Sequence, residues 1–209
     1  MARYARSERE SLADLLLALG PDAPTIDEGW VARDLAAHLV IRDRRPDAGA
    51  GVILPPLRDY GERIRLAATR RPYPELVDQV RRPPWWSPVS NRLVDELTNT
   101  MEFYIHHEDL RRAQPDWQPR QLPAELQAAL WRQVGPLARM SLRRVPGRLL
   151  VQSPGYGEFS AGSRGEVARL VGAPGELALF LFGRQRVARV QLVGSPALAE
   201  RLRTARLGF

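Results

Sequence analysis

The chain has 209 residues with 31 basic and 24 acidic side chains, which give a net charge of +7 and an isoelectric point near 10.8. Every basic residue is arginine, and the arginines alternate with acids without a helix-turn-helix, zinc-finger or RNA-recognition signature. The use of arginine alone therefore indicates codon bias as much as a function of the positive charge. Nucleic acid is only a minor candidate partner. The absence of cysteine excludes disulfides, thiolate metal sites and a cysteine nucleophile.

The first two thirds of the chain predict helices joined by proline-rich loops. Gly20-Pro21 ends the first of them, and the loop around Pro83 and Pro84 separates the fourth from the fifth. The expected helices cover about residues 4–19, 31–44, 57–69, 73–81, 91–113 and 123–144. The apolar stretch Leu12–Leu19 of the first helix is short and interrupted by Asp14, so it is typical of an amphipathic helix and not of a signal peptide. No transmembrane stretch is present, and we expect a cytoplasmic protein.

After Pro146 the helical periodicity gives way to shorter alternating segments. Strands are expected over residues 148–152, 166–171 and 186–193, and helices over 176–183 and 196–205. Glycine-rich turn material around Gly155-Tyr156-Gly157 separates the first two strands. We therefore expect a mainly α protein with a helical domain over residues 1–145 and a small α+β domain over 146–209.

The three histidines of the chain lie in two of the expected helices. Glu102 and His106 are four residues apart, so their side chains lie on adjacent turns of one face and can bind a single ion. His38 belongs to the second helix, at a position that normally faces a core. These residues predict a divalent-metal site formed by His38, Glu102 and His106. Two imidazoles and one carboxylate suit zinc with an open fourth position, and they equally suit non-haem iron.

Each of these residues also has an ordinary structural interpretation. The polar strip around Glu102 and His106 could be the solvated face of a surface helix, and His38 could be a hydrogen-bonded core residue. Asp109, one turn beyond His106, is a candidate for orienting that ring or for acting as a base, and its alternative is a salt bridge to Arg112. His107 points about 100° away from His106 and is expected to be a structural hydrogen-bonding residue.

Two further groups are candidates for lining a pocket. Arg42 and Arg45 follow His38 by four and seven residues on the same helix face, where they could bind a carboxylated substrate or form ion pairs with nearby acids. Trp85 and Trp86, flanked by prolines, could form a lid or simply pack their loop onto the helices.

Three segments carry a resemblance to a known family. They are Gly29–Leu39 with the sequence GWVARDLAAHL, Glu102–Asp109 with EFYIHHED followed by RRAQP at Arg111–Pro115, and Gly175–Arg184 with GELALFLFGR. The chain resembles, over nearly its whole length, the actinobacterial DinB-like metal-binding proteins related to mycothiol-dependent maleylpyruvate isomerase. The resemblance implies an antiparallel four-helix bundle in which His38, Glu102 and His106 bind a divalent metal, usually zinc, followed by a small α+β domain.

The resemblance also implies an activity, in which the metal activates a low-molecular-weight thiol for isomerisation or transfer on a small electrophile. Asp109 and Arg184 correspond to functional residues of the isomerase and are the candidate catalytic residues. Arg184 ends a strongly apolar segment, so we expect its charge to lie at a domain surface, facing either an anionic ligand or an acid of the helical domain. The implied partners are a low-molecular-weight thiol such as mycothiol and a small electrophilic substrate. The alternatives are a metal-binding or partner-binding module without catalysis, and a metal-dependent hydrolase.

Overall fold

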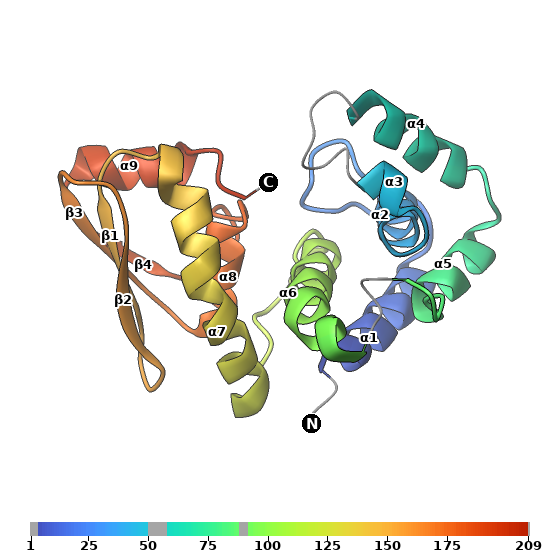
Figure 1. The fold of residues 1–209 in the computed structure, drawn as a ribbon, viewed down its shortest axis with the longest axis horizontal. Helices are drawn as coiled ribbons and strands as arrows, with labels where there is room; N and C mark the ends of the chain where they lie inside the picture. The colour runs from blue at the N-terminus through green and yellow to red at the C-terminus, as the bar shows by residue number, and fades with distance from the viewer. Residues whose placement is uncertain (1–3, 50–57, 88–91, 209) are drawn as a thin grey trace. The chain divides into compact units, whose positions relative to one another are not determined.

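The computed structural model describes residues 4–49, 58–87 and 92–208, which form two compact units (Figure 1). The first unit comprises Met1–Gln118 and the second Pro119–Phe209. The predicted boundary between residues 145 and 146 differs from this division, because helix α7 (Ala124–Ser141) packs against helix α8 (Pro174–Leu181) of the second unit. The expectation of a mainly α chain with an α+β portion at its C-terminal end is confirmed.

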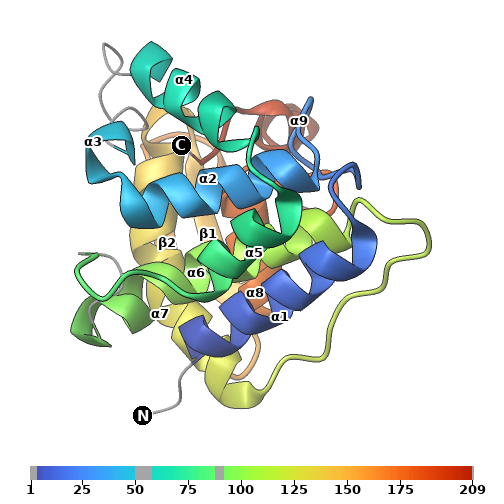
Figure 2. The same cartoon turned by 90° about the vertical axis from the view of Figure 1, so that its right-hand side faces the viewer.

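The first unit consists of helices in the described residues. They are α1 (Tyr4–Leu19), α2 (Ala32–Arg44), the short α3 (Pro46–Gly49), α4 (Arg58–Ala68), α5 (Tyr73–Arg81) and α6 (Arg92–Arg111). Apart from α3, which was not predicted, these bounds agree with the predicted helices to within about two residues wherever the chain is described. Figure 2 shows α1, α2, α5 and α6 layered beside one another, and α1 packs against both α5 and α6. In the described residues, no helix is both long enough and apolar enough to cross a membrane.

A hydrophobic core joins these helices. Leu12, Leu16, Leu35, Leu76 and Phe103 are among its fully or almost fully buried side chains. Burying leucine and phenylalanine side chains of this size stabilises a fold by roughly 1.5–3 kcal/mol each, which explains why the apolar stripes of the sequence predicted the helices well.

One buried arginine connects all four of the layered helices. Arg9 of α1 donates hydrogen bonds to the carboxylate of Asp43 on α2 and, over 2.9 Å, to the carbonyl of Val80 on α5. Its guanidinium also lies 4.1 Å from the ring centre of Phe103 on α6. Arg9 and Asp43 are 4% and 1% exposed, so the loss of either partner would leave an uncompensated charge in the core.

The second unit places helices against a mixed four-stranded sheet. The strands are β1 (Arg148–Ser153), β2 (Gly157–Gly162), β3 (Val167–Val171) and β4 (Gln191–Val193), in the order β2-β1-β3-β4. β1 pairs antiparallel with β2 and parallel with β3, and β4 is antiparallel to β3. Helix α7 packs against β2, where Trp131 and Phe159 meet with ring centres 5.4 Å apart.

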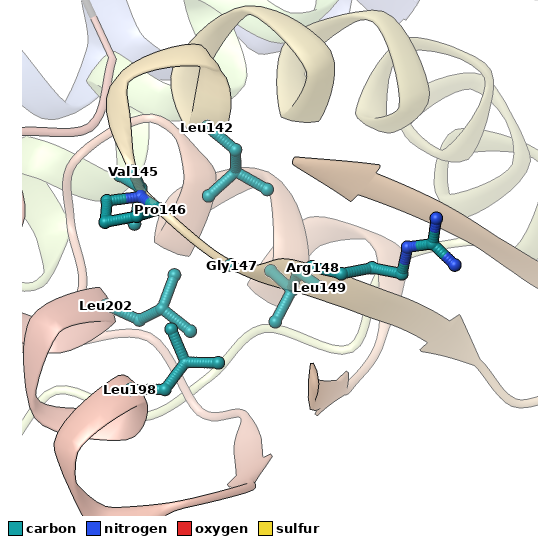
Figure 3. Close-up of a pocket in the computed structure, with 8 residues that line it drawn as sticks. All are labelled: Leu142, Val145, Pro146, Gly147, Arg148, Leu149, Leu198 and Leu202. Atoms are coloured by element: carbon teal, nitrogen blue, oxygen red, sulfur yellow. The ribbon is translucent and has the colours of Figure 1, made fainter. Parts of the chain in front are cut away.

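Apolar side chains pack closely together at one end of this sheet. The 3-10 turn η4 (Leu142–Arg144), the start of β1 and helix α9 (Pro196–Thr204) surround a small apolar hollow, where Leu142, Leu149, Leu198 and Leu202 converge (Figure 3). Gly147 enters β1 with φ of +124°, and a Cβ at this position would lie 2.9 Å from a methyl group of Leu198. The turn therefore needs glycine for both its backbone angle and its lack of a side chain.

The strand predictions of the second unit needed two corrections. Strand β2 occupies residues beyond the glycine-rich turn that the sequence pattern did not assign to a strand. The predicted strand over 186–193 is reduced to β4, because the preceding residues form a turn in which the carboxylate of Glu176 accepts the backbone N–H of Arg189 over 2.7 Å.

Candidate metal centre

The predicted ligand side chains come together from two helices of the first unit. His38 projects from α2, and Glu102 and His106 project from α6. Oε1 of Glu102 lies 3.4 Å from Nε2 of His38 and 3.3 Å from Nε2 of His106, and the three ligand atoms lie within 4.8 Å of one another. A tetrahedral zinc ion with ligand bonds of the usual length separates its ligand atoms by about 3.3 Å, so these residues fit such an ion.

The three candidate ligands differ in how far they are buried. The side chains of His38 and Glu102 are 23% and 17% exposed, whereas His106 is only 7% exposed. His38 and Glu102 are thus partly accessible to solvent, whereas His106 is nearly buried.

Asp109 lies directly behind His106. Its Oδ2 is 3.0 Å from Nδ1 of His106, and the Asp109 side chain is fully buried. A carboxylate that accepts the Nδ1 proton leaves Nε2 facing Glu102, which is the nitrogen that a metal would need. The arrangement matches the orienting role expected for Asp109.

Asp27 approaches the same ring and was not predicted from the sequence. Asp27, His106 and Asp109 form a second group whose possible ligand atoms lie within 4.8 Å of one another. The loop that carries Asp27 is held on α6 by a hydrogen bond from the backbone N–H of Ile26 to the carbonyl of Asp109, 3.1 Å long. This contact depends on the tertiary fold, and no local pattern in the sequence indicates it.

The protonation of the three candidate ligands is interdependent. Burial lowers the pKa of His38, because the hydrogen bond with Glu102 offsets the lost hydration only in part. Burial also acts on His106, but its hydrogen bonds with Asp109 and Glu102 outweigh this effect and raise the pKa of His106 to about 9. Burial alone would raise the pKa of Glu102, yet the two histidines and the charge of Arg42 hold it well below its usual value. Without a metal, His106 and Glu102 thus form an ion pair, and a cation must displace a proton.

A tryptophan ring packs beside His38. The ring of Trp30 lies 5.5 Å from that of His38, and the guanidinium of Arg65 lies 4.6 Å from the centre of the Trp30 ring. Arg65 is fixed by ion pairs of 2.6 Å with both Asp34 and Glu62. These side chains were not predicted to lie at the site, because their contacts join separate helices and a loop.

The two arginines that follow His38 differ in their surroundings. Arg45 forms ion pairs with Asp47 and a hydrogen bond with the hydroxyl of Tyr60, so the ion-pair alternative holds for this residue. Arg42 instead lies beside the candidate ligands, with its Nε 3.3 Å from Oε1 of Glu102.

His107 faces away from the cluster. Its Nδ1 lies 3.0 Å from Oε2 of Glu8 on α1, and both side chains are buried. The structural hydrogen-bonding role expected for His107 is therefore confirmed.

The remaining predicted residues lie elsewhere. Arg184 belongs to the second unit, where it follows α8, donates to the carbonyl of Phe182 over 3.0 Å and lies 5.6 Å from the Phe182 ring centre. Its catalytic role stays a prediction. Trp85 is 93% exposed and Trp86 is 50% exposed, so Trp85 does not pack its loop onto the helices.

Comparison with known proteins identifies a shared fold. No family model and no curated protein sequence matches the chain. Two solved structures do: that of a mycothiol-dependent maleylpyruvate isomerase, with 16% sequence identity, and that of a histidine-to-alanine mutant described under the same name, with 15%. Each alignment covers 90% of both chains with a TM-score of 0.59. The likeness supports a fold related to that of the isomerase.

Proposed function

We propose that the chain binds one divalent metal ion, zinc for preference, through His38, Glu102 and His106, and that it activates a low-molecular-weight thiol for isomerisation or transfer on a small electrophile. The observation that carries the proposal is the spacing of the three ligand atoms, with distances of 3.3 and 3.4 Å around one carboxylate oxygen. The fold shared with a mycothiol-dependent enzyme supports a thiol, and mycothiol in particular, as the cosubstrate.

The composition of the chain requires the thiol to come from outside. The chain has no cysteine, so a sulfur nucleophile must be a cosubstrate. When bound, the metal supplies a positive charge that lowers the pKa of a coordinated thiol, as it lowers that of water.

The residues around the ligands have separate roles in this proposal. Asp109 keeps the Nδ1 proton of His106 in place and holds a proton close to the reacting groups. Trp30 shields one side of His38 from water. Arg184 binds an anionic group of the substrate. The helices α1, α2, α5 and α6 form the four-helix bundle that holds α2 and α6 at the spacing the ligands need.

Metal stoichiometry in purified protein tests the ligand assignment. We expect one equivalent of Zn²⁺ or Co²⁺ in the wild type and less than a tenth of an equivalent in His38→Ala, Glu102→Ala and His106→Ala. His107→Gln is the matched control, since its ring adjoins the cluster in sequence but bonds to Glu8. Near-normal occupancy in all three ligand variants would reject the site.

The thiol role is tested on the Co²⁺ form. Addition of mycothiol, or of cysteine as a simpler thiol, should produce the near-ultraviolet band of a cobalt–thiolate bond. Metal binding without this band would leave a metal site that does not take a thiol, and hydrolysis of ester substrates by the same form would favour a metal-dependent hydrolase.

A further inference from the structure

The two units of the chain differ strongly in charge. The second unit, Pro119–Phe209, has fourteen arginines and five acidic residues, which give a net charge of +9. The first unit has seventeen arginines and nineteen acidic residues, which give a net charge of −2. A codon bias toward arginine acts on both units alike, so it does not explain this difference. Such an asymmetry between two parts of one chain indicates an anionic partner for the basic part.

The sheet of the second unit has one face that the helices leave open. Helices α7 and α8 lie on the other face (Figure 1), where Leu149, Val151 and Leu170 are buried. The alternate residues of the four strands point to the open face, and all of them are exposed or only partly buried. Val167 and Val193 of this face are 58% and 63% exposed, so the face is accessible to a partner.

Two arginines lie on the open face beside these valines. Arg148 is in register with Val167, and Arg169 is in register with Val193. Figure 3 shows the side chain of Arg148 pointing away from the apolar hollow at the end of the sheet. Both arginines are exposed, and within the described residues neither guanidinium has a hydrogen bond or an ion pair. Positive charge and apolar surface therefore occur side by side on this face.

Further positive charge gathers at the end of the sheet where β1 begins. Arg143 belongs to η4, just before β1, and Arg164 lies in the turn that joins β2 to β3. Both are exposed, and in the described part of the chain their side chains have no polar partner. Glu166 of the same turn is bound by Arg201 over 2.7 Å, and Glu158 lies at the opposite end of the open face. The acids near this end of the sheet thus leave its four arginines uncompensated.

The composition of the open face favours a lipid surface over a nucleic acid. Valines between arginines can contact the apolar part of a bilayer, whereas a phosphate backbone offers them no apolar partner. Phe159 lies on the covered side against Trp131, so the open face of the four strands has no aromatic ring on which bases could stack. A second copy of the same face would bring like charges together.

We propose that the open face of this sheet docks the protein on the surface of an anionic lipid bilayer. The guanidinium groups of Arg143, Arg148, Arg164 and Arg169 lie beside lipid phosphates, and the two exposed valines contact the apolar edge of the headgroup layer. Each arginine close to such a surface strengthens binding by about fivefold. The candidate metal ligands belong to the other unit, so this surface is a separate site and its binding does not require a metal.

Cosedimentation with vesicles tests the docking surface. The probes are vesicles of phosphatidylglycerol and phosphatidylcholine in equal parts, vesicles of phosphatidylcholine alone, and a labelled DNA duplex. The first variant carries both Arg148→Gln and Arg169→Gln. The matched control carries both Arg132→Gln and Arg139→Gln, which remove the same charge from exposed positions of α7.

We expect the wild type to bind the anionic vesicles and not the neutral ones. The variant of Arg148 and Arg169 should bind at least about tenfold more weakly, and the α7 control should stay within about twofold of the wild type. A second variant, Val167→Ser with Val193→Ser, should weaken vesicle binding by about threefold or more, because it removes the apolar contact. Thermal melting should match the wild type in every variant, since all six side chains are exposed.

Three results would overturn the proposal. The first is a wild type that does not bind anionic vesicles, or equal losses in the two arginine variants. The second is binding of the DNA duplex that depends on Arg148 and Arg169 without binding to vesicles, which would assign the face to nucleic acid. The third is a wild-type dimer that the valine variant dissociates, which would assign the face to a second copy of the chain.

Discussion

The contact between Asp109 and His106 predicts an unusual pH dependence of metal binding. With its pKa raised to about 9, His106 is protonated at neutral pH in the metal-free protein, and the metal must displace that proton. At pH 7 this competition weakens the apparent affinity by about 100-fold, or about 2.7 kcal/mol, and at pH 9 by only about twofold. The affinity should therefore rise by about 50-fold between pH 7 and pH 9, with most of this rise between pH 7 and pH 8.

The variant Asp109→Asn changes both the proton affinity and the metal affinity of His106. Asp109 is the first of the hydrogen-bonding groups that raise the pKa of His106, so its neutralisation lowers that pKa and relieves the proton competition. The variant also loses a carboxylate behind a ligating histidine, which typically costs 10–100-fold in metal affinity. We expect the variant to bind Co²⁺ 10–100-fold more weakly than the wild type at pH 9, and this difference to shrink at least tenfold by pH 6.5.

Dissociation constants measured by chelator competition between pH 6.5 and 9 provide the assay. Glu8→Gln is the matched control, because Glu8 faces the Nδ1 of His107 in the same way and should leave the pH profile unchanged. Parallel profiles for wild type and Asp109→Asn would refute the reasoning. The folding stability of the metal-free protein should change with pH in the opposite direction. The stabilisation from the raised pKa of His106 is fully present below pH 6.5 and is lost as the pH rises through about 9.

Two pairs of substitutions test the packing of each unit by urea denaturation. Asp43→Asn leaves Arg9 as an unpaired charge in the core and should lower the free energy of unfolding by about 3–5 kcal/mol, whereas Asp14→Asn removes a pair whose carboxylate is 69% exposed and should cost less than about 1 kcal/mol. Similar losses in both would contradict the role given to the buried pair. Gly147→Ala should destabilise the fold by about 1–3 kcal/mol, because its φ is +124° and its new methyl meets a neighbour at 2.9 Å. Gly135→Ala lies inside α7, where a new Cβ would meet no atom within 4 Å apart from its chain neighbours and the helix's own backbone, so it should cost less than about 1 kcal/mol even though it precedes Pro136. A loss as large as that of Gly147→Ala would count against this account.

The helices could be predicted because their apolar residues repeat with the helical period. Leu12 and Leu16 show this period in α1, and the positive φ of Gly20 ends that helix. The strands were harder to predict from the sequence. β2 contains Gly157, Ser160 and Gly162, residues with weak strand preference, and it is placed by pairing with β1 and not by its own sequence.

The candidate site likewise contains residues that the sequence predicts and residues that it does not. Glu102 and His106 are neighbours by helix geometry, and the scarcity of histidine pointed to His38, so the sequence predicted the cluster that the fold assembles. Asp27 and Trp30 could not be predicted, because a loop brings them to the site through contacts with α6 and α2. Whether a metal binds there stays a prediction.

The adjacent histidines of α6 have a consequence for how this segment can evolve. His106 turns toward Asp109 and Glu102, and His107 turns toward Glu8 on the neighbouring helix, so each ring has its own carboxylate. An insertion or deletion of one residue between Glu102 and His106 would rotate both rings by about 100° relative to the preceding turns of α6, so that His106 would no longer face Glu102 and His107 would no longer face Glu8. We therefore expect natural relatives of this chain to vary in length within their loops, but to keep this eight-residue stretch free of gaps.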